Sequence, residues 1–153
     1  MGHGHTVCLE FNSTYEMLDF VQVASDHLGR LAGLDDEALH WVGVAVRESV
    51  INAIKHGNSG DEQKHVYVEF TPIDTARPSG IVIRVRDEGP GFDPEALPDP
   101  LAPENMLKSS GRGIFLIRSF MDELVLRRAR EGGMEVVMVK RVSAPEFLQN
   151  ASE

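Results

Sequence analysis

Cysteine is almost absent from the sequence. Its single cysteine, Cys8, cannot form a disulfide within the chain. Cys8 lies in a run in which Val7, Leu9 and Phe11 alternate, so we expect an ordinary strand residue that packs as a small hydrophobe. The six histidines show no accompanying cysteine or zinc-site spacing, and we expect no structural metal.

Long apolar runs are also missing. No stretch approaches the ~20 consecutive apolar residues that span a bilayer. The N-terminal residues lack the charged-then-apolar order of a signal peptide. We therefore expect a cytoplasmic protein that makes no membrane contact.

Positive charge is scarce as well. The chain has 24 Asp and Glu against 15 Lys and Arg, which gives a net charge of −9. Nucleic-acid binding depends on Lys and Arg that neutralise phosphates, so we expect no direct nucleic-acid contact. The acidic charge suits a basic protein partner, but it equally suits a soluble acidic domain, and charge alone identifies no partner.

The length and composition fit one folding unit. The chain has 153 residues, of which 42% are hydrophobic. A chain of this size buries about two-thirds of its unfolded surface in one core. We therefore expect a single domain over residues 1–153.

The first half of the chain predicts a strand followed by two helices. Residues 6–11 alternate as a strand, and Ser13-x-x-Glu16 is a capping-box signal for the start of a helix. A second helix is expected over residues 38–56, because the acidic residues at 35–37 are typical of a helix start. Gly57 is suited to cap its C-terminal end.

The second half predicts two hairpins separated by a long segment and a helix. Residues 66–70 and 81–87 form the first hairpin, 113–121 the helix, and 123–128 with 134–141 the last hairpin. This order predicts an α/β sandwich of the α+β kind. Its mixed, mainly antiparallel sheet would be covered on one face by three helices.

The segment from Gly89 to Gly111 is unusually long for a connection within a compact domain. Its prolines leave little room for a long helix: Pro90, Pro94, Pro98, Pro100 and Pro103. Loops of this length are commonly functional lids or disordered segments, so the length itself is informative.

The stretch RESVINAIKHGN places Glu48, Asn52 and His56 at intervals of four residues. Residues at this spacing lie along one side of a helix. Taken alone, the stripe is explained equally well by a solvated helix face. It gains meaning only in combination with other motifs.

The stretch RVRDEGPGFDP places Asp87 in register with the apolar alternation of residues 81–85. A carboxylate on the core-facing side is costly unless a ligand donates a hydrogen bond to it, and the exocyclic amine of adenine is such a donor. Gly89 and Gly91 allow a tight turn and close backbone approach. By itself, this motif is more often a surface turn.

The stretch SSGRGIFLI places Gly111 and Gly113 before an apolar helix. Free amides at such a helix start can face phosphate oxygens. Lys108 and Arg112 are both candidates to add positive charge there. A glycine pair before a helix is weak evidence when it stands alone.

In combination, these stretches resemble the N, G1 and G2 boxes of GHKL ATPases, in the family's order and over about residues 5–141. The closest likeness is to RsbW-type anti-sigma-factor kinases. It rests on Glu-x-x-x-Asn-Ala-x-x-His-Gly, Asp-Glu-Gly-Pro-Gly-Phe-Asp and Gly-Arg-Gly-Ile-Phe-Leu-Ile-Arg-Ser-Phe-Met-Asp. The resemblance implies a Bergerat (histidine-kinase-like ATPase) fold with an ATP lid at about 92–110, and a tail at 143–153 without a clear role.

The resemblance also implies roles for individual residues. Glu48 would be the general base, Asn52 a Mg²⁺ ligand and Asp87 the carboxylate that binds adenine. His56 and Gly57 would be structural. The remaining nucleotide contacts would come from Gly89, Gly91, Lys108, Gly111, Arg112 and Gly113.

The function implied by the resemblance is an ATP- and Mg²⁺-dependent serine/threonine kinase. It would be a homodimer that sequesters a sigma factor and phosphorylates an anti-sigma-factor antagonist. Two alternatives stay open, a non-catalytic ATP-dependent binding switch and an ATPase that transfers phosphoryl to water. Glu48 favours an enzyme, because a pure binder needs no base there. Larger GHKL relatives and histidine kinases need further domains, for which we expect no room.

Overall fold

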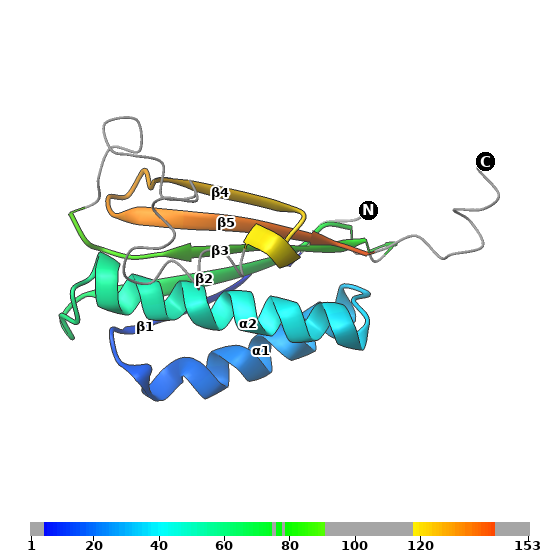
Figure 1. The fold of residues 1–153 in the computed structure, drawn as a ribbon, viewed down its shortest axis with the longest axis horizontal. Helices are drawn as coiled ribbons and strands as arrows, with labels where there is room; N and C mark the ends of the chain where they lie inside the picture. Colours follow the sequence, from blue (N-terminus) through cyan, green and yellow to red (C-terminus); the bar gives the residue numbers. More distant parts are fainter. Residues whose placement is uncertain (1–4, 75, 78, 91–117, 143–153) are drawn as a thin grey trace.

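The protein folds as one antiparallel sheet with helices packed on one face (Figure 1). The computed structural model describes residues 5–74, 76–77, 79–90 and 118–142. Its two long helices are α1, Leu18–Leu31, and α2, Asp36–Asn52. A short 3₁₀ turn, Tyr15–Met17, leads into α1, and a π-helical turn, Ala53–Gly57, continues α2.

Five strands form the sheet in the order β1-β2-β3-β5-β4. They are β1 Val7–Asn12, β2 His65–Pro72, β3 Gly80–Arg86, β4 Glu123–Arg128 and β5 Met134–Arg141. Every neighbouring pair is antiparallel, and no parallel pair occurs among the described strands. Both predicted hairpins and the mainly antiparallel sheet are confirmed.

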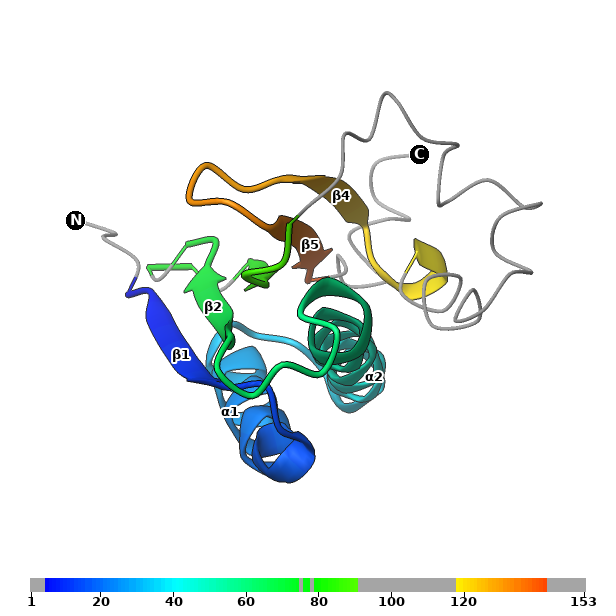
Figure 2. The same ribbon diagram turned by 90° about the vertical axis from the view of Figure 1, so that its left-hand side faces the viewer.

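The core lies between the sheet and the two long helices, which occupy the same side of it (Figure 2). The largest fully buried side chains come from both layers and include Phe70, Ile54, Ile81, Ile83 and Met138. The start of α2 agrees with the sequence, because the carboxylate of Asp35 accepts a hydrogen bond from the amide of Ala38 at 2.8 Å. Such an N-cap satisfies an amide that the helix itself leaves without a partner.

The capping box predicted at Ser13 does not form. The Ser13 hydroxyl donates to the carbonyl of Lys64 at 2.7 Å and accepts from the Asn58 amide at 2.8 Å. Ser13 is buried, so its hydroxyl satisfies groups of the core rather than the helix start. The chain instead turns through the 3₁₀ segment, and α1 begins at Leu18.

Gly57 does not act as the predicted left-handed helix cap. The amide of Asn58 donates to the carbonyl of Ala53 at 2.8 Å, so the helix closes through a π turn. The positive φ angles come later, at Ser59 and Gly60. Gly57 is required for a different reason, which the packing around Asp87 reveals.

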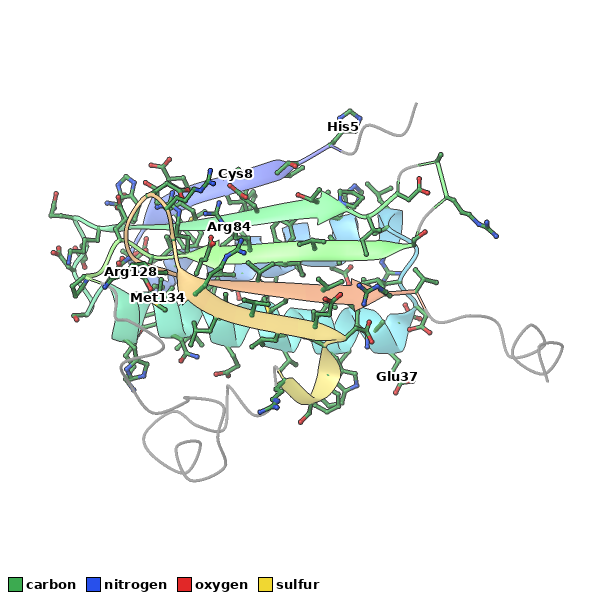
Figure 3. The ribbon with its side chains drawn as sticks, turned by 90° about the horizontal axis from the view of Figure 1, so that it is seen from above. His5, Cys8, Glu37, Arg84, Arg128 and Met134 are labelled. Atoms are coloured by element: carbon green, nitrogen blue, oxygen red, sulfur yellow. The ribbon has the colours of Figure 1, made fainter. Side chains whose placement is uncertain are left out.

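Cys8 lies on β1 as predicted but is exposed, which corrects the expectation of a buried hydrophobe. The same strand buries Phe11, and residues at odd positions therefore face the helices. Cys8 has the opposite parity and lies on the helix-free face of the sheet (Figure 3).

The predicted third helix lies mostly outside the described residues, which contain only its helical end at 118–120. Phe120 stacks on Trp41 of α2 with ring centroids 3.6 Å apart, and its carbonyl accepts from the Lys140 ammonium at 3.0 Å. This end of the helix therefore packs on α2. No helix in the described ranges is both long and apolar enough to cross a membrane.

We predict that Phe70→Ala lowers the free energy of unfolding by about 3–5 kcal/mol, because it empties a fully buried aromatic site. Phe20→Ala is the matched control. Phe20 is 53% exposed, and its truncation should change stability by less than about 0.5 kcal/mol. Urea unfolding measures both, and equal effects would contradict this placement of the core.

Candidate functional site

Three segments meet around the carboxylate of Asp87. They are the π turn at the end of α2, the end of β3, and the start of β5 after the β4–β5 turn. The amide of Asp87 donates to the carbonyl of Met134 at 3.0 Å. The sheet therefore continues one residue beyond β3 and brings Asp87 to the edge of the core.

The Asp87 side chain is buried, as the strand parity predicts, with 5% of the residue exposed. Its Oδ1 accepts hydrogen bonds from the amides of Gly89 at 3.0 Å and Met134 at 3.1 Å. Burial raises the pKa of the carboxyl above its ordinary value, while these two amide bonds act in the opposite direction. The protein thus holds a carboxyl group whose ionisation is costly.

Glycines surround Asp87 because no side chain fits there. A Cβ on Gly57 would lie 2.0 Å from Oδ2 of Asp87, and a Cβ on Gly89 would lie 1.9 Å from the carbonyl oxygen of Gly57. Gly133 has a φ of +82°, and a Cβ there would lie 2.2 Å from the Asp87 carbonyl oxygen. Gly57 is therefore a packing requirement of the site.

Glu48 and Asn52 lie one turn apart on α2, and both are half-buried. Their neighbours Val46 and Val50 are fully buried and fix the rotation of the helix on the sheet. Asn52 is the last α-helical residue, and the π turn after it ends at Gly57 against Asp87. The structure therefore brings the Asn52 end of α2 and the Asp87 end of β3 to the same end of the fold. His56 is exposed in the π turn.

Several predicted site residues lie outside the described residues. They are Gly91, Lys108, Gly111, Arg112 and Gly113, together with the predicted lid at 92–110 and the tail at 143–153. Their roles stay predictions. Within the described part of the chain, no group of three or more His, Cys, Asp and Glu is placed to hold a metal ion.

Sequence reasoning missed two contributors to the site. Asn58 is fully buried, and its Oδ1 accepts from the amide of Glu88 at 2.7 Å. Met134 supplies a backbone amide to Asp87. The only signals were the asparagine that ends RESVINAIKHGN and the Gly132-Gly133 turn, which look like ordinary loop residues.

Residues 11–140 match the family model of the histidine kinase-like ATPase domain. The chain belongs to this family. Proteins similar to it include several named serine-protein kinase RsbW and one named anti-sigma F factor.

The serine-protein kinase RsbW of Listeria monocytogenes is 26% identical over 151 residues, covering 95% of this chain and 92% of the relative. The anti-sigma F factor of Oceanobacillus iheyensis is 34% identical over 147 residues, covering 93% and 96%. The RsbW of Staphylococcus epidermidis is 28% identical over 142 residues, covering 88% and 86%. The resemblance to RsbW-type kinases is therefore confirmed.

A solved structure shares the fold. The crystal structure of the RsbU and RsbW domains of Rv1364c from Mycobacterium tuberculosis superposes with a TM-score of 0.59 at 15% identity. The match covers 92% of this chain, which spans only 33% of that longer chain. This histidine kinase-like ATPase therefore has the predicted Bergerat fold.

We predict that Asp87→Asn changes how stability depends on pH. Because the pKa of Asp87 is raised by folding, the unfolded chain loses this proton first as pH rises. The wild-type free energy of unfolding then falls by about 1.4 kcal/mol for each unit by which folding raises that pKa.

This loss of stability begins as the pH rises past the pKa of an unfolded aspartate, about 3.9, and is complete once the pH exceeds the raised pKa of Asp87 in the folded protein. The amide side chain of the variant carries no such proton, so the variant should gain stability relative to wild type across that window. Urea unfolding over a pH series measures the difference. Asp19→Asn, at an exposed position, controls for net charge, and a pH-independent difference for Asp87→Asn would contradict the assignment.

Proposed function

We propose that this chain is a cytoplasmic, Mg²⁺-dependent serine/threonine protein kinase that acts as an anti-sigma factor. It would sequester a sigma factor and phosphorylate an antagonist of the anti-sigma factor. The observation that carries the proposal is the buried carboxylate of Asp87, held by two backbone amides beside the end of α2. The names of its relatives, a serine-protein kinase and an anti-sigma factor, support the kinase reading.

The Asp87 carboxylate would recognise adenine. Both amide donors bind Oδ1, while Oδ2 lies against the backbone of Gly57. A donor from the exocyclic amine of adenine would compensate for the burial of the charge, since charge-assisted hydrogen bonds are among the stronger ones. Gly89 would keep the backbone close without a side chain in the way.

Asn52 would supply an amide oxygen to Mg²⁺. This cation prefers oxygen ligands and keeps several waters, so one protein ligand and the ATP phosphates are enough. A multi-carboxylate cluster is therefore not needed here. The half-buried position of Asn52 at the end of α2 suits a ligand that faces a bound nucleotide.

Glu48 would accept the proton of the attacking serine or threonine hydroxyl. The hydroxyl oxygen forms a bond to the γ-phosphorus, the bond from that phosphorus to the β–γ bridging oxygen breaks, and ADP leaves. Glu48 is one helical turn from Asn52, so the base and the proposed metal ligand lie on one side of α2.

The partners would be proteins rather than nucleic acid. We propose a homodimer that binds a sigma factor and exchanges it for the unphosphorylated antagonist. Phosphorylation adds negative charge to the antagonist beside a chain of net charge −9, which favours its release.

We predict that Glu48→Gln retains ATP binding and lowers phosphoryl transfer by at least about 10²-fold, the usual contribution of a general base. Asn52→Ala should weaken ATP binding in Mg²⁺ but much less in EDTA. Labelled ATP with candidate antagonists encoded beside the gene measures transfer, and calorimetry measures binding. Transfer at the wild-type rate by Glu48→Gln would remove the proposed base. Absence of transfer by wild type with ATP bound would favour the non-catalytic switch.

We predict that Asp87→Asn weakens ATP binding by roughly tenfold or more, because the amide replaces a charged acceptor with a neutral one. GTP, which carries no amine at that ring position, should bind wild type weakly and lose little in the variant. Calorimetric titration with both nucleotides is the test. Equal affinity of wild type for ATP and GTP, unchanged in Asp87→Asn, would exclude Asp87 from adenine recognition.

A further inference from the structure

A closed ring of hydrogen bonds joins Asn58, which follows α2, His65 at the start of β2, and Glu88, which follows β3. The side-chain amide of Asn58 donates to the carbonyl of His65 at 3.0 Å. The backbone amide of His65 donates to Oε1 of Glu88 at 2.6 Å. The backbone amide of Glu88 donates to Oδ1 of Asn58 at 2.7 Å and closes the ring.

The ring fixes the two backbone segments that lie next to the Asp87 carboxylate, one adjacent in the chain and one adjacent in space. Glu88 follows Asp87 directly in the chain. Gly57, which precedes Asn58, lies against Oδ2 of Asp87. A shift of Asn58 would therefore move the Gly57 backbone, which lies against the carboxylate, and also the Asp87–Glu88 peptide, whose amide is bonded to Asn58.

Asn58 has the properties of a fixed anchor. It is fully buried, and its remaining amide hydrogen is donated to the Ser13 hydroxyl at 2.8 Å. Both donors and the acceptor oxygen of the side chain are thus used. The backbone N–H of Glu88 also determines the orientation of the Asn58 side-chain amide, because only Oδ1, and not Nδ2, can accept that hydrogen bond.

We propose that Asn58 is a positioning residue, which fixes the Asp87 carboxylate for the exocyclic amine of adenine and so sets the preference for adenine nucleotides. The inference rests on the proposed ATP site. Asn58 touches no nucleotide atom in this proposal and acts through Gly57 and Glu88. Hydrogen bonds have donor–acceptor distances of about 2.7–3.2 Å and weaken steeply when the angle at the hydrogen becomes poor, so a displaced or tilted Asp87 carboxylate loses most of the selectivity.

The test compares ATP with purine riboside triphosphate, which lacks the exocyclic amine. Asn58→Ala should lower ATP affinity roughly tenfold and the affinity for the analogue by less than about twofold. Asn12→Ala is the matched control. It removes a side-chain hydrogen bond to the carbonyl of Glu62, at 2.7 Å in the same connection before β2. The backbone of Asn12 lies opposite His65 in the β1–β2 pair and is kept in the variant, and the Asn12 side chain makes none of the three bonds of the ring. This variant should leave both affinities unchanged.

A second variant covers the case in which Asn58→Ala does not fold. Glu88 is exposed, and Glu88→Ala removes the acceptor of the His65 amide without emptying the core. Its ATP affinity should fall more than its affinity for the analogue. If Glu88→Ala loses the same affinity for ATP as for the analogue, or loses none, the positioning role is wrong and the ring is purely structural.

Failure of the proposed ATP site would look different. In that case wild type itself would bind neither nucleotide, or bind both equally. The positioning of Asp87 would then be read by NMR, from the titration of its carboxyl and from exchange of the Glu88 amide. Faster exchange and a carboxyl pKa closer to its ordinary value in the Asn58 variant, but not in Asn12→Ala, would support positioning. Unchanged values would overturn it.

Discussion

The burial of one carboxylate constrains this end of the fold. Asp87 continues a core-facing strand alternation, and a charge at such a position must be satisfied by neighbouring donors. Two backbone amides supply those donors, and they come from the loop after β3 and from the start of β5. Gly57 and Gly133 follow from the same constraint, because their backbones pack where a side chain would collide with Asp87.

Local sequence patterns predicted most of the helices and strands, and they predicted the burial of the Asp87 side chain for a physical reason. Strand parity is a property of the backbone, so the burial of Asp87 followed from the apolar residues before it. The cap at Asp35 was equally local, because its partner is only three residues away. The capping box at Ser13 had the same local logic but was wrong, since the Ser13 hydroxyl is bound to groups 51 and 45 residues away.

The rest of the site could not be predicted because its causes are tertiary. A glycine after a helix is usually a left-handed cap, yet Gly57 is needed because of contact with Asp87 of another element. Asn58 looked like a turn residue, whereas its partners lie in β2 and after β3. In β1, Cys8 has the opposite parity to the buried Phe11, so strand geometry places it on the outer face. The expected packing of Cys8 as a small hydrophobe rested on the usual burial of free cysteine, which strand parity overrides here.

Ion pairs on the helix-free face of the sheet also help to hold the backbone around the Asp87 carboxylate. Arg84 lies on β3 at this face (Figure 3). Its side chain is bonded to Glu135 of β5 and to Glu131 of the β4–β5 turn. Burial lowers the pKa of Arg84, but its bonds to these two glutamates outweigh that effect and raise it. The turn held in this way contains Gly133 and is followed directly by Met134, the first residue of β5, and the backbones of both residues contact Asp87. Asp87 is therefore held in place before any ligand arrives. A preorganised acceptor of this kind spares a ligand the cost of ordering the site.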